Sequence, residues 1–410
     1  MTARFAFIAV LVAGCHGATI HEALPDGGGG DAGGGTGGGI AGTTGGGGRA
    51  GTGGAGGGAG RGGTTGAAGA TGGRGGSAGA GCAAQMTPQM FYRGDLPPLF
   101  TAVTPNRFYW VEYNSPSLAL HYTAGYPPAE NKHMIQISSA PLNSYEITAS
   151  DVRVAGLQAY NKELSVWGPD SGSTQIDEMT MASANAIAID GPTIFYSVNA
   201  PGGSVTPGIY TWNPPAGPTL FESDAELGRD RTNGSLLRVT PTKLLLSDYA
   251  DVWFVDRAAK GPRTLLFANP TTRVIQEVRP ARGLTTEGPV IVQIDDPIVL
   301  SGRDYYVNLT QPTAAPKDLG TATTILAGAS ACGSAANYNG VGVQYEQRYI
   351  YEGDGGLFAV DIAADGSVSN LVRLTDTPFS YPEVTESGDL FAGTLATGSS
   401  RWDYYRIGKL

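Results

Sequence analysis

A strand–turn–strand pattern recurs along the chain from residue 100 to the end. Each copy has an apolar, alternating run, a short polar turn and a second run, which is the signature of two paired strands. The copies lie at residues 100–110 (FTAVTPNRFYW), 154–167 (VAGLQAYNKELSVW), 184–197 (ANAIAIDGPTIFYS), 234–248 (GSLLRVTPTKLLLSD), 289–302 (PVIVQIDDPIVLSG), 339–353 (NGVGVQYEQRYIYEG) and 382–393 (PEVTESGDLFAG). Most copies are followed by a third run and several by a fourth. The chain therefore predicts an all-β domain of repeated four-stranded units.

Units of four strands that recur about every 40–50 residues are typical of the blades of a β-propeller. A single blade buries only part of its apolar surface, whereas a closed ring buries both faces of every blade. The seven copies predict one propeller with seven blades. The copy at residues 154–167 is short and is compatible with a partial blade, so six blades are the alternative. A two-sheet sandwich is the structural runner-up, but it does not predict a repeat of this period.

The last copy supplies three strands before Leu410. A ring needs a fourth strand there, because an open sheet edge would leave backbone groups unpaired. We expect residues 89–92 (QMFY) to supply it and to close the ring from the other end of the domain.

The strings RFYWVEY, TIFYSVN and RYIYEGD resemble the aromatic strand of YWTD-type and TolB-like propellers. The resemblance extends from about residue 90 to the end as a loose pattern, without a complete YWTD string, a WD dipeptide closing each blade or an Asp-box. It implies a propeller fold. It implies little about function, because propellers host many unrelated activities.

The start of the chain has the features of an export signal. Arg4 is followed by an apolar run over residues 5–12 and by the sequence Val-Ala-Gly-Cys ending at Cys15. The run is too short for a transmembrane helix. The ending resembles the lipobox of bacterial lipoproteins, which implies a signal peptide over residues 1–14 and acyl chains on Cys15. An ordinary secretory signal with an incidental cysteine is the alternative.

Residues 15–82 are predicted to form a disordered tether between Cys15 and the propeller domain at residues 83–410. Most of this segment consists of Gly, Ala and Thr, with almost no apolar side chains to bury in return for ordering the backbone. A coil of this length has a typical reach of about 40 Å. The resemblance and the tether together predict a lipid-anchored protein of the cell envelope, at the periplasmic face or the cell surface. His16 gives no inner-membrane retention signal of the enterobacterial kind, which favours the outer membrane.

With Cys15 acylated, Cys82 and Cys332 remain as an even pair. In an oxidising compartment such a pair predicts a disulfide, which would attach the end of the tether to the ring. Two thiols too far apart to bridge are the alternative.

The sequence does not indicate a catalytic, metal or cofactor site. His121 and His133 are the only histidines of the domain, and neither lies in a zinc-binding motif. Asp190 lies in a turn between paired strands, where Asp is favoured for its turn geometry. The net charge of −10 disfavours nucleic acid and docking onto anionic lipid, so we expect the acyl chains to hold the membrane.

Two functions fit these features. The first is a binding or scaffold propeller that recognises a protein, peptide or glycan through residues that the sequence does not identify. The second is a propeller enzyme of the lyase, hydrolase or sugar dehydrogenase type, with its site at the central channel. The scarcity of histidine favours the first. Titratable residues clustered at the channel mouth would favour the second.

Overall fold

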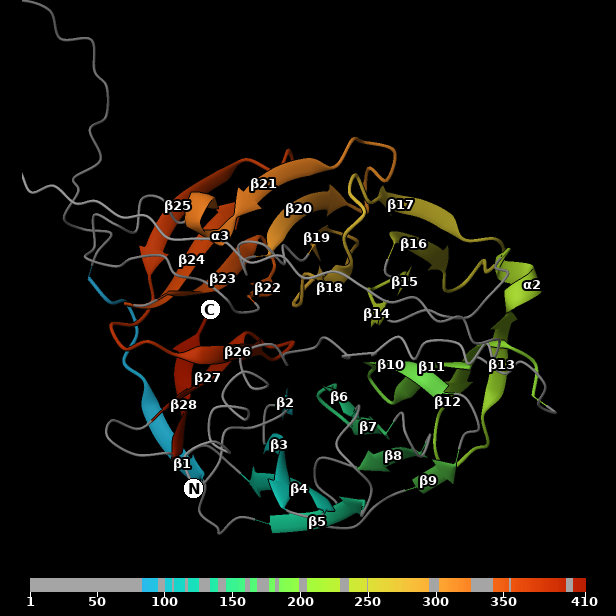
Figure 1. The fold of residues 1–410 in the computed structure, drawn as a ribbon, viewed down its shortest axis with the longest axis horizontal. Coiled ribbons are helices and arrows are strands. Elements are labelled where there is room, and N and C mark those ends of the chain that lie inside the picture. Colours follow the sequence, from blue (N-terminus) through green and yellow to red (C-terminus); the bar gives the residue numbers. More distant parts are fainter. Residues whose placement is uncertain are drawn as a thin grey trace, which may run out of the picture. The chain divides into compact units, whose positions relative to one another are not determined.

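The computed structural model describes residues 83–410 except 95–99, 105–106, 115–116, 125–132, 139–144, 159–162, 168–176, 181–183, 199–204, 229–235, 249, 295–301, 326–341, 354 and 396–400. All described residues belong to one compact unit. Within them, seven four-stranded antiparallel sheets account for every strand. The domain is a β-propeller, as the repeat predicts (Figure 1).

The first three sheets follow one another along the chain. The first contains β2 (Phe100–Thr104), β3 (Arg107–Asn114), β4 (Ser117–Ala124) and β5 (His133–Ser138). The second contains β6 (Tyr145–Ala149), β7 (Val154–Gln158), β8 (Glu163–Trp167) and β9 (Asp177–Thr180). The third contains β10 (Ala184–Asp190), β11 (Thr193–Val198), β12 (Gly208–Trp212) and β13 (Thr219–Ser223), and the helical turn α2 (Asp224–Leu227) follows it.

The remaining four sheets complete the series. The fourth contains β14 (Leu236–Val239), β15 (Lys243–Ser247), β16 (Asp251–Asp256) and β17 (Thr264–Ala268). The fifth contains β18 (Ile275–Pro280), β19 (Pro289–Ile294), β20 (Arg303–Asn308) and β21 (Lys317–Thr321), followed by α3 (Ala322–Ile325). The sixth contains β22 (Val343–Tyr345), β23 (Arg348–Gly353), β24 (Gly356–Ile362) and β25 (Val368–Arg373), and the last contains β26 (Ser380–Val384), β27 (Asp389–Leu395), β28 (Trp402–Lys409) and β1 (Gln89–Gly94).

The innermost strands form a closed ring. They contact one another in the order β2, β6, β10, β14, β18, β22 and β26, and β26 contacts β2 again (Figure 1). The second strand of each sheet packs against the neighbouring sheets, and its sequence is a nearly continuous apolar run. In β11 (TIFYSV), for example, every residue after the first is buried. The outermost strands face solvent, and β25 contains no fully buried residue.

Strand β1 closes the ring, in agreement with the prediction for residues 89–92. It pairs antiparallel with β28, so a strand from the start of the domain becomes the outer strand of the last sheet. Arg93 on β1 donates to both carboxylate oxygens of Asp403 on β28, at 2.5 and 2.8 Å.

An aromatic cluster packs the closing sheet against the first one. Phe91 of β1 lies 5.4 Å from Phe108 of β3 between ring centroids, and Tyr404 of β28 lies 4.7 Å from Phe108. The Tyr92 ring lies 4.5 Å from that of Trp110, tilted by 41°, and Trp110 is fully buried. The two ends of the domain are therefore joined both by backbone pairing and by a shared core.

The segment that enters β1 is attached to the sixth sheet. Gln85 N donates to Arg373 O at 3.2 Å, and Met86 N donates to Leu374 O at 2.9 Å. The Met86 side chain packs against the core between the sixth and last sheets. Residues 85–94 thus span two sheets on the rim of the ring.

Two predicted copies are displaced by one strand. Residues 154–167 form β7 and β8, the second and third strands of their sheet, because the first strand β6 precedes them. This sheet is complete, so the expectation of a partial blade there is wrong. Likewise, Pro289 begins the second strand β19, and the first strand of that sheet is β18.

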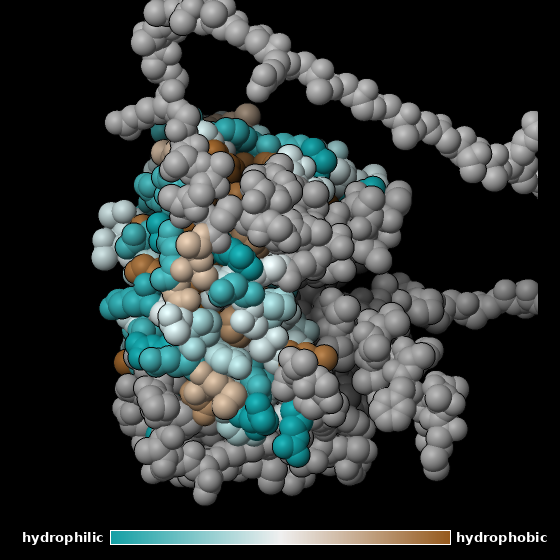
Figure 2. All heavy atoms as spheres, turned by 90° about the vertical axis from the view of Figure 1, so that its left-hand side faces the viewer, coloured by the Kyte–Doolittle hydropathy of each residue, from teal (hydrophilic) through white to brown (hydrophobic). Residues whose placement is uncertain are grey.

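On the described outer surface, exposed hydrophobic side chains are scattered among polar ones. On the described part of the face that bears β1 and β25, hydrophilic and hydrophobic residues are intermixed (Figure 2). Met90, Val368 and Leu395 are among the exposed large hydrophobic residues. Each described helix has only four residues, and neither has the length or hydropathy to cross a membrane.

Ring closure predicts unequal effects for two neighbours on β1. Phe91 is 8% exposed inside the aromatic cluster, whereas Met90 is 48% exposed. We expect Phe91→Ala to lower the free energy of unfolding by about 3–5 kcal/mol, because it leaves a cavity at the closure. Met90→Ala should change it by less than about 0.5 kcal/mol. Denaturant titration followed by tryptophan fluorescence measures both, and equal effects would contradict the role of β1.

Candidate functional site

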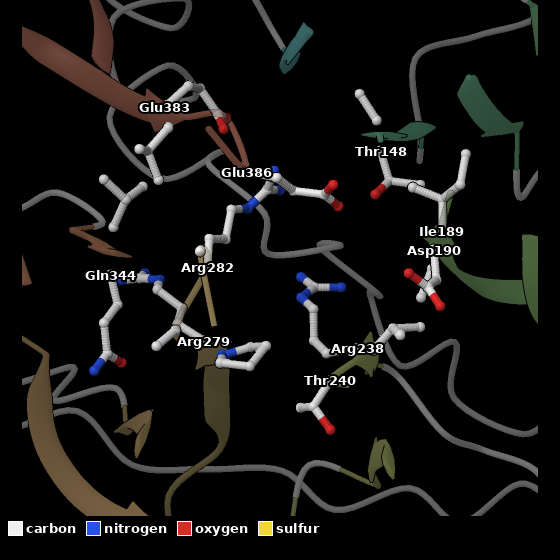
Figure 3. A pocket seen from close by; sticks show the side chains of 18 of the residues that line it. Thr148, Ile189, Asp190, Arg238, Thr240, Arg279, Arg282, Gln344, Glu383 and Glu386 are labelled. Atoms are coloured by element: carbon white, nitrogen blue, oxygen red, sulfur yellow. The ribbon is translucent and has the colours of Figure 1, made fainter. Parts of the chain in front are cut away.

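A cavity of about 550 Å³ occupies the axis of the ring. It is lined by all seven innermost strands and by the turns that follow several of them. Its charged lining residues are Asp190, Arg238, Glu277, Arg279, Arg282, Glu383 and Glu386 (Figure 3). The channel of this propeller therefore holds both charge signs within a single cavity.

The two charge signs come from different parts of the ring. The arginines belong to β14, to β18 and to the turn that follows β18. The carboxylates of Glu383 and Glu386 come from β26 and the turn after it, and Asp190 comes from the end of β10. Only Glu277, on β18, lies among the arginines. Three of these groups lie at or just beyond the carboxyl ends of innermost strands, namely Asp190, Arg282 and Glu386.

Arg282 is held in place by its backbone. It lies in the turn of residues 281–288, between β18 and β19. Its N–H donates to Gln344 O at 3.1 Å, and its carbonyl accepts from Glu346 N at 2.8 Å. These bonds attach the start of the turn to the neighbouring β22–β23 hairpin. The backbone that carries the Arg282 side chain into the channel is thereby fixed.

The residue after Arg282 has to be glycine. Gly283 has a φ of +78°, in the left-handed region, and a Cβ there would lie 2.5 Å from Cε2 of Tyr345. The Tyr345 ring also lies against Gly388 of the β26–β27 turn, where a Cβ would be 2.8 Å from Cζ. Tyr345 thus fits between the turns of two neighbouring sheets at the channel mouth.

The end of the same turn is attached to the sheet on its other side. Glu287 Oε1 accepts hydrogen bonds from Thr240 Oγ1 at 2.8 Å, from Thr242 N at 2.6 Å and from Thr242 Oγ1 at 2.8 Å. Residues 281–288 therefore bridge three sheets, from β14 to β22. A turn with this many fixed points is a rigid support for the side chains that it carries into the channel.

Within the cavity, two carboxylates have defined partners. Arg238 Nη2 lies 2.7 Å from Glu277 Oε1, an ion pair in which the Glu277 side chain is 5% exposed. Thr101 Oγ1 donates to Glu383 Oε1 at 3.1 Å. Burial in the channel raises the pKa of Glu383 to about 7, against the opposing effects of Arg282 and of the Thr101 hydrogen bond. Glu383 therefore changes charge near neutral pH.

Arg279 connects the channel to buried acids in the neighbouring sheet. Its Nη1 donates to Tyr349 Oη at 2.5 Å. Nearby, Asp304 is 1% exposed and accepts from Gln293 Nε2 at 3.1 Å and from Tyr351 Oη at 3.2 Å. Burial raises the pKa of Asp304 to about 6, although Arg279 favours its ionised form.

The mouth itself is rich in carboxylates. Burial and the charges of Asp151 and Asp190 raise the pKa of Glu386, while Arg282 lowers it. Asp151, in the turn after β6, also has a raised pKa, because burial outweighs the attraction of Arg282. Asp190 forms an ion pair with Arg257. Arg282 and Glu386 lie near one another in this space (Figure 3).

This arrangement limits the chemistry of the described lining. It offers guanidinium groups that can bind carboxylates or phosphates and carboxylates that can bind cations or exchange protons near neutral pH. The described lining residues include no Ser, Cys, His or Lys. In the described part of the chain, no three His, Cys, Asp or Glu side chains lie close enough together to hold a metal ion.

Sequence reasoning identified few of these residues. Cys15, Cys82 and Cys332 lie outside the described residues, so the predicted lipidation and disulfide stay predictions. Asp190 is the last residue of β10 and reaches the cavity, although its sequence context indicated only a turn. Glu277 and Arg279 were missed because β18 was not recognised as an innermost strand. Their signal was the alternation of charged and apolar residues in QEVRP, with charges on the face that lines the channel.

Comparisons with known proteins found no family and only distant structural similarity. No protein-family model and no curated protein matches the chain. Among solved structures, prolyl endopeptidases are 15% identical, with a TM-score of 0.47 and coverage of 78% of this chain and 49% of theirs. The chain thus spans about half the length of those enzymes.

Two further similarities are to propellers. The β-propeller domain of the trilobed protease from Pyrococcus furiosus is 10% identical, with a TM-score of 0.42 and coverage of 67% of this chain and 80% of that one. TolB from Acinetobacter baumannii is 11% identical, with a TM-score of 0.39 and coverage of 65% and 66%, respectively. At these levels the similarity concerns the fold alone.

The raised pKa of Glu383 predicts a pH-dependent stability. Its pKa is about 7 in the folded protein and near 4.5 in an unfolded chain. Its contribution is therefore fully present below about pH 4.5 and is lost as the pH rises to about 7. The unfolding free energy of the wild type should decrease over this range. We expect Glu383→Gln to make this decrease smaller by about 1–3 kcal/mol. Urea titrations at several pH values measure it. The exposed Asp318→Asn is the control, and parallel pH profiles for wild type and Glu383→Gln would contradict the assignment.

Proposed function

We propose that this protein is a lipid-anchored component of the bacterial cell envelope that displays a propeller as a binding module, with its ligand site at the mouth of the central channel. The observation that carries the proposal is the convergence of charged side chains from four sheets on one axial cavity of about 550 Å³. Cavities of this size with a few fixed polar groups are the usual sites for ligands and inserted side chains.

Preorganisation supports binding at this mouth. Arg282 is fixed by backbone hydrogen bonds to the next sheet, and the other end of its turn is fixed by Glu287. A turn whose backbone is held in this way loses little backbone freedom when a ligand binds, so more of the contact energy contributes to affinity. A turn with only a connecting role would not need attachment to three sheets.

Delivery to the envelope rests on the sequence. Acyl chains on Cys15 would hold the membrane, and the glycine-rich segment up to residue 82 would separate it from the propeller. The entry segment at Gln85 and Met86 is bonded to the rim of the ring rather than to the channel. Tension on the tether would therefore act on the rim and leave the channel mouth unobstructed.

The anchoring proposal predicts the location of a single variant. Cys15→Ala removes the acylated thiol, and we expect the protein to move from the membrane fraction to the soluble fraction of the envelope. Fractionation with globomycin-treated wild-type cells in parallel measures this. Retention of Cys15→Ala in the membrane would contradict the anchor.

The binding proposal predicts cross-linking at the channel mouth. A photoreactive amino acid at Glu386, which is exposed at the mouth, should give a specific adduct in intact cell envelopes. The same group at Val368, which is exposed on the outer strand β25, should not. Adding Arg282→Ala should reduce the adduct at position 386. Equal adduct patterns at the two positions, or no adduct at position 386, would overturn the channel as the binding site.

A propeller enzyme with its site in the same cavity is the second candidate. The clustering of titratable residues at the mouth favours it, and the pKa of Glu383, about 7, suits a group that donates and accepts protons near neutral pH. If this candidate is correct, Glu383→Gln should abolish conversion of the cross-linked ligand while retaining its binding. If Glu383→Gln leaves the bound molecule unchanged in identity and amount, the binding module stands.

A further inference from the structure

We propose that the last sheet is docked into the ring by a proton-sensitive clamp on its innermost strand, β26. The carboxyl groups of Glu352 and Glu383 hold this strand on its two sides, and their ionisation loosens it from both neighbouring sheets. Docking is therefore firm at mildly acidic pH and weaker at mildly alkaline pH. This property belongs to the ring itself and does not depend on which ligand the channel binds.

On one side, β26 is held by the sixth sheet. Glu352, on β23, accepts a hydrogen bond from the backbone N–H of Tyr381 on β26, with a distance of 2.6 Å between Oε1 and N. Strand β26 also contacts β22 and β23 of that sheet. The carboxyl group of Glu352 thus joins a side chain of the sixth sheet to the backbone of the last one.

On the other side, β26 is held by the first sheet. Glu383 of β26 accepts a hydrogen bond from Thr101 Oγ1 of β2 at 3.1 Å. The contact between β26 and β2 is the one that completes the ring of innermost strands. The last sheet therefore meets both of its neighbours through a carboxyl group, and a single strand makes both connections.

The backbone of β26 is irregular between these two connections. Tyr381 has a φ of 62°, in the left-handed region that is unfavourable for a residue with a side chain. The pairing of β26 with β27 shifts register between Ser380 and Glu383, so the strand bulges there. The hydrogen bond from Tyr381 N to Glu352 supports this bulge. Because the bulge lies directly before Glu383, its loss would displace the residue that bonds to Thr101.

The surroundings of Glu352 keep its carboxyl group largely uncharged below neutral pH. Burial is the largest effect and raises the pKa of Glu352 to about 7. The N–H of Tyr381, the charge of Arg279 on β18 and the Ser380 hydroxyl all oppose burial by favouring the ionised form. Ionisation of Glu352 therefore places a charge between the sixth and last sheets against the cost of burial.

Glu383 has the same balance with other neighbours. Burial again is the largest effect and raises the pKa of Glu383 to about 7. The charges of Arg282 and Arg279 and the Thr101 hydroxyl lower this pKa, whereas the charge of Glu277 raises it. In an opened sheet that exposed them to water, both glutamates would have a pKa near 4.5.

The direction of the pH effect follows from this difference. A carboxyl group whose pKa is higher in the docked sheet than in water stabilises the docked sheet fully below the lower of the two values, near 4.5. That stabilisation is lost as the pH rises to about 7. Opening of the last sheet should therefore become more frequent over this range and then level off.

Amide hydrogen exchange of the full chain without ligand tests the inference. Exchange is followed by mass spectrometry and corrected for the intrinsic exchange rate at each pH. We expect the protection of β26, β27 and β28 to be at least about tenfold lower at about pH 8 than at about pH 5.5. Strand β15 of the fourth sheet is the internal reference and should change by less than about twofold.

Matched variants separate the charge from the hydrogen bond. Glu352→Gln and Glu383→Gln each keep an acceptor oxygen and remove a charge, so each should reduce the pH dependence and the double variant should abolish it. Glu352→Ala also removes the acceptor and should lower the protection of the Tyr381 N–H at both pH values. Asp304→Asn is the control, because Asp304 is another buried acid with a raised pKa whose hydrogen-bond partners lie in the fifth and sixth sheets. The pH dependence of the last sheet should persist in it. Circular dichroism melting confirms that each variant is folded.

The wild type alone can overturn the clamp, even where a variant fails to fold. Protection in the last sheet that does not change with pH, or that changes as much as protection in β15, would contradict it. Persistence of the pH dependence in the double variant would contradict the assignment to Glu352 and Glu383. Because no ligand is present, none of these outcomes bears on the proposed binding module, which the cross-linked adduct at position 386 tests.

Discussion

Closure of the ring by β1 and β28 is the interaction on which the axial cavity depends. The innermost strands contact one another in a closed series, and the pairing of β1 with β28 supports the contact between β26 and β2 that completes it. The antiparallel ladder between β1 and β28, with the aromatic cluster around Phe91 and Tyr404, joins the two ends of the domain there by hydrogen bonds and apolar packing. The position of Glu383 beside Thr101 spans this same junction, because one residue lies on β26 and the other on β2.

The channel has an arrangement of charges that a purely structural core would avoid. The acids near Arg279 and Arg282 include three whose pKa is raised to between about 6 and 7, namely Asp304, Glu352 and Glu383. Apolar residues of similar size would usually be at least as stable at such positions. The ring tolerates these groups because its stability comes from the contacts between sheets. Neighbouring sheets share clusters such as the one that joins Val252 of the fourth sheet to Val290 of the fifth.

The sequence predicted the features that depend on local patterning. Alternating runs and turns gave the all-β repeat, and the missing strand of the last copy identified residues 89–92 as the closing strand. These predictions succeeded because strand periodicity and edge pairing are properties of short segments. The prediction of which strand begins each sheet was wrong at two copies. There, second strands such as β19 (PVIVQI) are more apolar than the first strands beside them. Because the second strand is buried between neighbouring sheets, it has the most apolar sequence of the sheet. A less apolar first strand is therefore easily missed in the sequence.

The candidate site was hidden for the same reason. Charges on innermost strands, such as those of Glu277 and Arg279 on β18, weaken the apolar pattern by which a strand is recognised. Their convergence is also a property of the closed ring, since Glu386 and Arg282 are separated by more than a hundred residues. In a propeller, then, functional residues at the axis are those that most disturb local strand patterns and that only closure brings together.

Ring closure forms the cavity, and a ligand in the cavity would in turn stabilise ring closure. A ligand at the mouth would contact groups from β18 and from the last sheet, which are not neighbours around the ring. It would therefore bind only the closed arrangement and add its binding free energy to closure. The strands that close the ring lie at its rim, whereas the charged groups lie at its axis. The ring can thus keep an electrostatically unfavourable cavity ready for a ligand, because apolar clusters between neighbouring sheets hold it together as well.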